Sequence, residues 1–421
     1  MKKILFIIID GLGDQPIKAL GDKTPLEVAK TPNLDFLAKE GKTGLIYPIS
    51  KKIAPESDTA ITALLGYDPY KYFTGRGPIE AFGFGLKFKK GNLALRTNFA
   101  TTSGKKIIDR RAGRTLTSQE AKELASSVNK KVKLSFPFIF QPTLQHRGVL
   151  LIYGNLSGAI SNTDPGYEKV GNLGVVPQRP SFNLKESKPQ DKKKISQLSA
   201  NLINEFTRQS HKILENHPLN KERTKKNLLP ANIILARDAG IDLPKFPPKK
   251  EKWAAVCSMP LEKGLALLSK MDLLTFRYPE MKNQDVYSHL YYGLREEMKY
   301  GEGYLKEKLS QYDAFYLHFK EIDIPGHDGR PKDKIKMLEI LDKDFFSFLR
   351  KLKNVLVVVT GDHSTPCKIK LHTSDPVPLL IYDGKNKDGV LRFGESYCRG
   401  GSLGHIMGKD LMKKVLSLSR S

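Results

Sequence analysis

A run of apolar, mostly β-branched residues from Val355 to Thr360 constrains the fold of this chain more than any other stretch. Such a run is typical of a strand that is buried on both faces of a parallel sheet. Asp362 and His363 follow it, so a carboxylate and an imidazole would emerge at the carboxyl end of the strand, where open α/β sheets bind ligands. His372 comes shortly afterwards, before a second apolar stretch, Val377 to Tyr382. Imidazole and carboxylate groups suit zinc and manganese, although Asp362 and His363 could instead cap a turn.

Two other apolar runs are also followed by acidic residues. Ile4 to Ile9 ends at Asp10, and Ala314 to Phe319 is followed by Asp323 and His327. We expect Asp323 and His327 to lie in a turn from which both side chains point into one site. Taken alone, Asp10 is explained as a loop cap. If the three runs share one parallel sheet, however, their polar ends meet at the same edge.

Ser57 precedes an apolar helical segment, Ala60 to Leu65. Either Ser57 or Asp58 is well placed as the N-cap of this helix. Alternatively, Ser57 is a metal-activated nucleophile, because backbone N–H groups and the dipole at a helix start favour negative charge. The local sequence leaves both interpretations open.

A set of side chains would meet at the sheet edge if the three strands are neighbours. Its members are Asp10, Ser57, Asp323, His327, Asp362, His363 and His372. The set is too large for one tetrahedral ion and suits two ions, with Ser57 shared or adjacent. Separate capping roles would all have to coincide at strand ends, so we predict a two-metal site.

The pattern of apolar and polar residues changes between about Gly85 and Asp272. Short alternating segments and a long lysine-rich helical stretch take the place of buried strands, and turn signals join them. We therefore predict a smaller inserted α+β domain at 81–274. The catalytic domain would then be discontinuous, formed by 1–80 and 275–421.

Three arginines lie close together in the insertion, namely Arg110, Arg111 and Arg114. Clustered guanidinium groups suit a bidentate grip on phosphate or carboxylate. Arginines on a solvated loop give the same pattern, so the cluster alone does not decide its role.

The chain is strongly basic, with 70 Lys and Arg against 45 Asp and Glu and a net charge of +25. Such a field attracts anions, but much of the excess is scattered lysine, and no nucleic-acid-binding motif accompanies it. No apolar run approaches the roughly 20 residues of a membrane helix. Three widely spaced cysteines, Cys257, Cys367 and Cys398, argue for a reducing compartment, so we expect a cytoplasmic protein.

Three motifs also carry a resemblance to a known family. They are APESDTAITALLGYDPYKYFTGRGPIEAFGFG (54–85), IDIPGHDG (322–329) and GDHSTPCKIKLHTSDPVPLLI (361–381). The chain resembles the archaeal-type 2,3-bisphosphoglycerate-independent phosphoglycerate mutases of the alkaline phosphatase superfamily over nearly its whole length. This resemblance implies an α/β fold, an alkaline-phosphatase-like core with a mostly parallel sheet and helices on both faces, plus the inserted α+β domain.

The resemblance also implies an activity and a ligand set. The expected enzyme is an isomerase that interconverts 3-phosphoglycerate and 2-phosphoglycerate in glycolysis and gluconeogenesis through a phosphoserine at Ser57. Two divalent ions are expected, manganese first, with zinc, cobalt or magnesium as alternatives. Matched by position, one ion belongs to Asp323, His327 and His372, and the other to Asp10, Ser57, Asp362 and His363.

Substrate contacts are expected from the insertion, with Arg110, Arg111 and Arg114 holding the substrate carboxylate and Asp164 serving in proton transfer. The expected partners are small phosphoglycerates, with neither nucleic acid nor membrane. Three features depart from the family pattern: Pro279 to Asp285 lacks a glycine-containing hinge, EID stands in place of a GVD-like run before Pro325, and His405 stands where arginine is expected. A phosphomonoesterase, phosphonate hydrolase or phosphopentose mutase of the same superfamily is the alternative, and a basic nucleic-acid-binding protein is a more distant one.

Overall fold

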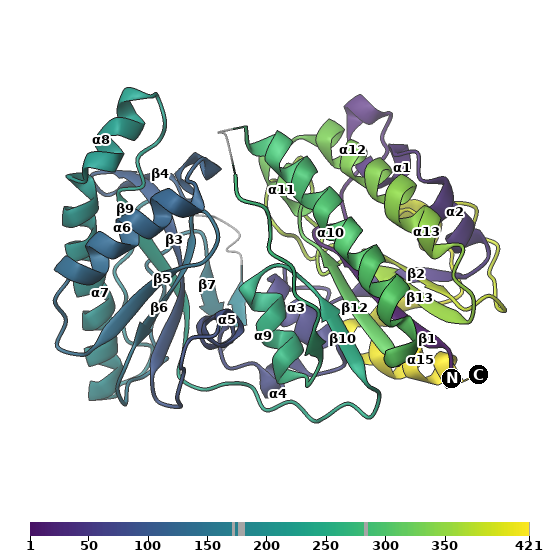
Figure 1. The fold of residues 1–421 in the computed structure, drawn as a ribbon, viewed down its shortest axis with the longest axis horizontal. Coiled ribbons are helices and arrows are strands. Elements are labelled where there is room, and N and C mark those ends of the chain that lie inside the picture. The colour runs from purple at the N-terminus through teal and green to yellow at the C-terminus, as the bar shows by residue number, and fades with distance from the viewer. Residues whose placement is uncertain (171–172, 176–181, 282–284, 421) are drawn as a thin grey trace.

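Three apolar strands stand side by side at the centre of the larger of two lobes (Figure 1). β1 (Lys3–Ile9) lies between β12 (Ala314–Phe319) and β13 (Val355–Thr360), parallel to both. In register, Ile9 is opposite Phe319 and Ile8 is opposite Thr360. The residues that follow these strands therefore leave the sheet at one edge, as the sequence predicts. The computed structural model describes residues 1–170, 173–175, 182–281 and 285–420.

The large sheet contains eight strands among the described residues. Their order is β11 (Asp272–Leu273), β10 (Trp253–Val256), β12, β1, β13, β14 (Val377–Tyr382), β2 (Lys42–Tyr47) and β15 (Gly404–Met407). β14 is antiparallel to both of its neighbours, and the other pairs are parallel. The predicted α/β class with a mostly parallel sheet is confirmed.

Helices cover both faces of this sheet (Figure 1). One group comprises η1 (Lys18–Leu20), α1 (Pro25–Val28), α2 (Pro32–Lys39), α10 (Val286–Lys308), η3 (Leu309–Gln311), α11 (Asp323–Asp328), α12 (Pro331–Leu341), η4 (Asp342–Phe346), α13 (Ser347–Leu349) and α14 (Glu395–Cys398). The other comprises α3 (Ser57–Leu64), α4 (Pro69–Tyr72), α9 (Pro260–Leu268) and α15 (Gly408–Arg420), whereas α5 (Arg76–Phe84) packs between α9 and strands of the smaller lobe. Within the second group α3 packs against both α9 and α15, so two neighbouring helices position the helix that begins at Ser57.

The smaller lobe is an α+β unit with its own apolar core. Its antiparallel sheet contains β3 (Leu93–Ser103), β4 (Lys106–Asp109), β5 (Phe138–Pro142), β6 (Arg147–Ile152) and β9 (Ile233–Gly240). Around it lie η2 (Ala112–Arg114), α6 (Ser118–Lys131), α7 (Lys194–Glu215), α8 (Pro218–Lys225) and the pair β7 (Glu168–Val170) and β8 (Leu173–Val175).

The return from the smaller lobe comes earlier than the sequence places it. β10 and β11 fall within 81–274, yet both belong to the large sheet, where β10 pairs with β12. With four residues, β10 is as short as β4 of the insertion, so its length does not show to which sheet it belongs. The chain is back in the larger lobe by Trp253.

Two further details differ from the sequence-based expectation. The sequence predicts a helix over 403–416 that is interrupted near Gly408, but 404–407 form β15 beside β2, and the helix begins at Gly408. A Cβ at Gly408 would lie 2.2 Å from the Pro48 carbonyl oxygen, so the glycine permits this close approach. Of Pro279 to Asp285, positions 282–284 lie outside the described residues. None of the described helices is long and apolar enough to cross a membrane.

Candidate active site

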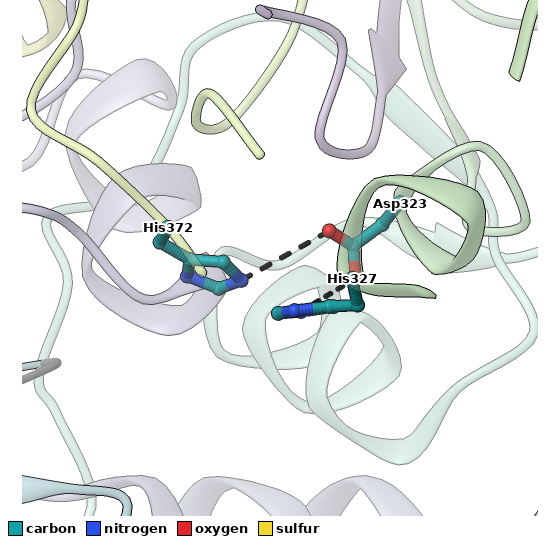
Figure 2. Close-up of side chains that lie close together, drawn as sticks. All are labelled: Asp323, His327 and His372. Carbon is teal, nitrogen blue, oxygen red and sulfur yellow. Dashed lines mark ion pairs between the residues drawn. The ribbon is translucent and has the colours of Figure 1, made fainter. Parts of the chain in front are cut away.

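The edge of the large sheet at the ends of β1, β12 and β13 gathers the acidic residues and histidines singled out from the sequence. Asp10 follows β1, Asp323 opens α11 just beyond β12, and Asp362 and His363 follow β13. Each of these side chains is buried. Figure 2 shows His372, from the segment before β14, facing Asp323 and His327.

Asp323, His327 and His372 form a compact group. The Nε2 atom of His327 lies 3.3 Å from Asp323 Oδ2, and that of His372 lies 3.9 Å from Oδ1 (Figure 2). On the opposite side of each ring, Nδ1 donates to a backbone carbonyl, that of Lys370 at 3.0 Å and that of Pro55 at 2.9 Å. Both Nε2 lone pairs therefore remain available, as in metal-ligating histidines.

The local backbone around this group differs from the sequence prediction. Asp323 and His327 lie on one turn of helix α11, whereas a turn without helix was expected. The helix is short and contains Pro325 and Gly326, which mask the helical signal in the sequence. The spacing of four residues puts both side chains on one helix face.

A second group surrounds the Nε2 atom of His363. This atom lies 3.3 Å from Asp10 Oδ1, 3.3 Å from Asp362 Oδ2 and 3.3 Å from Ser57 Oγ. The same two carboxylate oxygens are buried without a hydrogen-bond partner among the described residues. Two unsatisfied anionic oxygens, an imidazole and a hydroxyl are a donor set that fits a divalent cation.

Thr365 fixes the tautomer of His363. Its hydroxyl donates to Asp323 Oδ1 at 2.7 Å, so it accepts a hydrogen bond from His363 Nδ1 at 3.0 Å. The proton is then on Nδ1, and Nε2 faces the carboxylates with its lone pair. Burial lowers the pKa of His363 well below its usual value, which favours this neutral form.

Ser57 is the first residue of α3 and not its cap. The N-cap is Glu56, and its side chain makes no capping hydrogen bond. The Ser57 hydroxyl, 4% exposed for the residue as a whole, instead faces His363 and the ammonium group of Lys320, whose Nζ lies 3.3 Å from Oγ. The capping interpretation of Ser57 is therefore wrong.

Lys320 is a site residue that sequence reasoning missed. It follows β12 directly and contacts Asp10 Oδ2 as well as Ser57, with Glu262 Oε1 at 3.7 Å. Burial alone would lower its pKa, but the neighbouring carboxylates, Asp10 first, outweigh burial and raise it. A lysine directly after an apolar strand was the signal that could have identified it.

A cavity of about 70 Å³ adjoins both groups and lies between the lobes. Its lining includes Ser57, Asp323, His327, His372 and Lys320 from the larger lobe and the basic residues Arg96, Arg111, His146, Arg147 and Arg237 from the smaller one. Burial first, and then the charge of Arg114, lowers the pKa of Arg111 to about 10. The cavity is thus suited to a small, multiply charged anion.

In the structure the three arginines of the predicted cluster have different partners. Arg111 lines the cavity, but Arg110 binds both carboxylate oxygens of Asp164, at 2.7 and 2.9 Å, and lies outside the lining. Arg114 pairs with Asp328. The cavity instead contains Arg147, which the sequence places at a turn beside His146, together with Arg96 and Arg237, which sequence reasoning missed because each is the only basic residue of its strand.

The fold and this site define a class of protein: a two-lobed α/β enzyme in which carboxylates, imidazoles and a serine meet beside an arginine-lined cavity. Comparison with known proteins identifies the family within that class. A family profile described as 2,3-bisphosphoglycerate-independent phosphoglycerate mutase matches residues 38–220. The chain belongs to this family, and its activity is that of an isomerase.

The similarity extends over the full chain. A mutase of this name from Thermococcus gammatolerans is 41% identical, with 99% of this chain and 97% of the relative covered. One from Aeropyrum pernix is 39% identical, with 99% of both covered. A solved protein structure from Pyrococcus horikoshii is 32% identical with a TM-score of 0.74, covering 100% of this chain and 97% of that one. The cofactor-independent phosphoglycerate mutase from Thermoplasma acidophilum is 30% identical with a TM-score of 0.57 and 100% coverage of both.

Proposed function

We propose that this chain interconverts 3-phosphoglycerate and 2-phosphoglycerate through a phosphoserine formed on Ser57. The observation that carries the mechanism is the position of the Ser57 hydroxyl, 3.3 Å from both His363 Nε2 and Lys320 Nζ, beside the arginine-lined cavity. A nucleophile needs activating groups at this range.

Two divalent metal ions are part of the proposal. Asp323, His327 and His372 would hold one, and Asp10, Ser57, Asp362 and His363 would hold the other. Manganese is the first candidate, and zinc, cobalt and magnesium suit similar ligands. When bound, such ions lower the pKa of a coordinated hydroxyl and offset charge on a transferring phosphoryl group. The orientation of all three imidazoles by Nδ1 hydrogen bonds supports this assignment.

The residues of the chain have separate tasks in the transfer. The Ser57 oxygen attacks phosphorus in line, at the start of α3, where backbone N–H groups favour negative charge. Lys320 places an ammonium group beside the attacking oxygen, and stays charged because its pKa is raised by Asp10. These groups are fixed before reaction, so they stabilise developing charge without reorganisation.

Glycerate must stay bound while its second hydroxyl replaces the first opposite the phosphoserine. Arg111, Arg96 and Arg147 line the cavity from the smaller lobe, and we propose that they hold the carboxylate. Arg110 and Asp164 engage each other, and Arg110 packs with its guanidinium 4.4 Å from the Tyr167 ring centre. Their proposed task is therefore to support the wall of the cavity. The enzyme would work in the cytoplasm, where its three buried thiols remain reduced.

Replacement of Ser57 by Ala tests this mechanism. The coupled conversion of 3- to 2-phosphoglycerate should fall to background, while metal content measured on the purified protein changes little, because six of the seven candidate ligands remain. Thr62→Val is the matched control, since its hydroxyl lies on the same helix and bonds to the Asp58 carbonyl at 2.7 Å instead of facing the site. Full turnover in the Ser57 variant would exclude the serine mechanism.

A further inference from the structure

A bridge between the lobes lies outside the cavity and has no part in the chemistry proposed so far. The carboxylate of Asp328 accepts a hydrogen bond from Arg114 Nη1 through Oδ1 and one from the Tyr287 hydroxyl through Oδ2, at 2.8 Å. Arg114 belongs to the smaller lobe, whereas Asp328 on α11 and Tyr287 on α10 belong to the larger one (Figure 1). We call these three residues the interlobe bridge.

The loop that carries Arg114 is held in a costly conformation. Ala112, Gly113 and Arg114 follow one another with φ angles of 46°, 66° and 56°, a region that residues other than glycine rarely adopt. Asp109 Oδ1 holds the loop by accepting from the backbone N–H groups of Arg111, at 2.6 Å, and Gly113, at 3.1 Å. Such conformations persist where the surroundings impose them and are concentrated at functional sites.

This loop couples two positions of the site. The same turn places Arg111 in the lining of the cavity, beside Ser57, and places Arg114 where it forms an ion pair with Asp328. The bridge therefore fixes the distance between the cavity arginine and the larger lobe, because the short loop leaves Arg111 and Arg114 little freedom to move separately.

The other end of the bridge is attached to the helix with the metal-ligand candidates. Asp328 directly follows His327 on α11, which also carries Asp323. The Arg330 guanidinium lies 3.7 Å from the centre of the Tyr287 ring and holds that ring beside Asp328. The Arg114 and Asp328 side chains are only 11% and 27% exposed, so their pairing is partly shielded from water.

We propose that the interlobe bridge keeps the lobes closed while Ser57 is phosphorylated, and thereby decides whether the phosphoryl group returns to glycerate or goes to water. This inference rests on the proposed function, since it concerns the fate of the phosphoserine. Asp328 and Tyr287 act through Arg114 and the loop and touch no reacting atom, so they are positioning residues.

Both outcomes break the same bond. In transfer, a glycerate hydroxyl oxygen bonds to phosphorus, the Ser57 Oγ–P bond breaks, and the hydroxyl proton returns to the serine oxygen. In hydrolysis, a water oxygen takes the place of the glycerate oxygen, and inorganic phosphate and free glycerate result. Opening the lobes favours the second course, because it admits water and moves Arg111 away from the glycerate carboxylate.

The test compares two products made by the metal-loaded full chain from 3-phosphoglycerate: 2-phosphoglycerate and inorganic phosphate. Asp328→Asn removes the charge that Arg114 meets, and Tyr287→Phe removes one hydroxyl. Tyr291→Phe is the control, because Tyr291 lies one turn further on α10 and donates to Asp333 at 2.8 Å within the larger lobe. We expect the ratio of phosphate to 2-phosphoglycerate to rise about tenfold in D328N, equivalent to about 1.4 kcal/mol. Y287F should show a smaller rise, and Y291F should keep the parental ratio.

An unchanged ratio in folded D328N overturns the inference, and so does an equal fall of both products, which is the result of general structural damage. If D328N does not fold, Y287F alone decides by the same criterion. A rise in Y291F equal to that of the bridge variants also counts against it. In the Ser57→Ala background phosphate release should vanish; isomerisation that persists there refutes the proposed function instead, so the two failures are distinguishable.

Discussion

Replacing Glu80 by Gln should destabilise the protein far more than a surface substitution of the same kind. Glu80 lies on α5 and is fully buried. Its carboxylate accepts from Arg96 Nη1 at 2.6 and 2.7 Å and from Arg76 Nε at 2.6 Å. Arg96 belongs to β3 of the smaller lobe, so this cluster fastens the lobes together next to the cavity.

The magnitude follows from the pKa of Glu80. Burial alone would raise this pKa, but Arg96 and then Arg76 outweigh burial and lower it from 4.5 to about 2. That fall corresponds to about 3 kcal/mol of folding stability. Because the folded pKa is depressed, this contribution is present above about pH 4.5 and is lost as the pH falls toward 2. In Glu80→Gln two guanidinium groups also stay buried without their counter-charge, so we expect a loss of about 3–5 kcal/mol at pH 7.

Urea unfolding is the appropriate assay, because urea leaves ion pairs unscreened. Trp253 is the only tryptophan, is buried in β10 and provides the fluorescence signal. Glu302→Gln is the control, since its pair with Lys306 is exposed and should contribute less than about 0.5 kcal/mol. A loss below about 1 kcal/mol for Glu80→Gln, or one that does not shrink between pH 7 and pH 3, would refute the reasoning. Since Arg96 also lines the cavity, the KM for phosphoglycerate should rise.

Two further predictions concern packing and metal. Gly83→Ala should cost at least about 1–3 kcal/mol in thermal unfolding, because its Cβ would lie 1.9 Å from the Pro260 carbonyl oxygen. Gly303→Ala, with nothing within 4 Å of the added Cβ among the described residues, should be neutral or stabilising by up to about 1 kcal/mol. A chelator should lower the unfolding temperature of the metal-loaded protein, because removal of the metal ion leaves the buried carboxylates of Asp10 and Asp362 without a counter-charge. Equal unfolding temperatures with and without metal would contradict the metal assignment.

The core of the site could be anticipated because strands buried on both faces have a strong sequence signal. The runs before Asp10 and Asp362 are continuous and apolar, the run before Asp323 is apolar except for His318, and in a parallel sheet their carboxyl ends must lie at one edge. Burial and topology together therefore predict that residues hundreds of positions apart in the sequence meet at one edge of the sheet.

The cavity could not be anticipated in the same way. Arg147 begins β6 and Arg237 lies within β9, and the sequence of these strands does not show which group either arginine faces. Their partners depend on how one lobe packs against the other, and the periodicity of the sequence carries no information about that packing. Arg110 was identified by its neighbours in sequence, but its pairing with Asp164 is tertiary.

The central position of β1 has a consequence for biosynthesis. Lys3–Ile9 is made well before its two neighbours in the sheet, β12 and β13, which follow more than 300 residues later in the chain. The segments of the smaller lobe are contiguous in the chain and can collapse as soon as they are synthesised. β1, which is apolar from Ile4 to Ile9, therefore lacks both of its sheet neighbours until they are synthesised, and chaperone binding to this segment would be most needed during that interval.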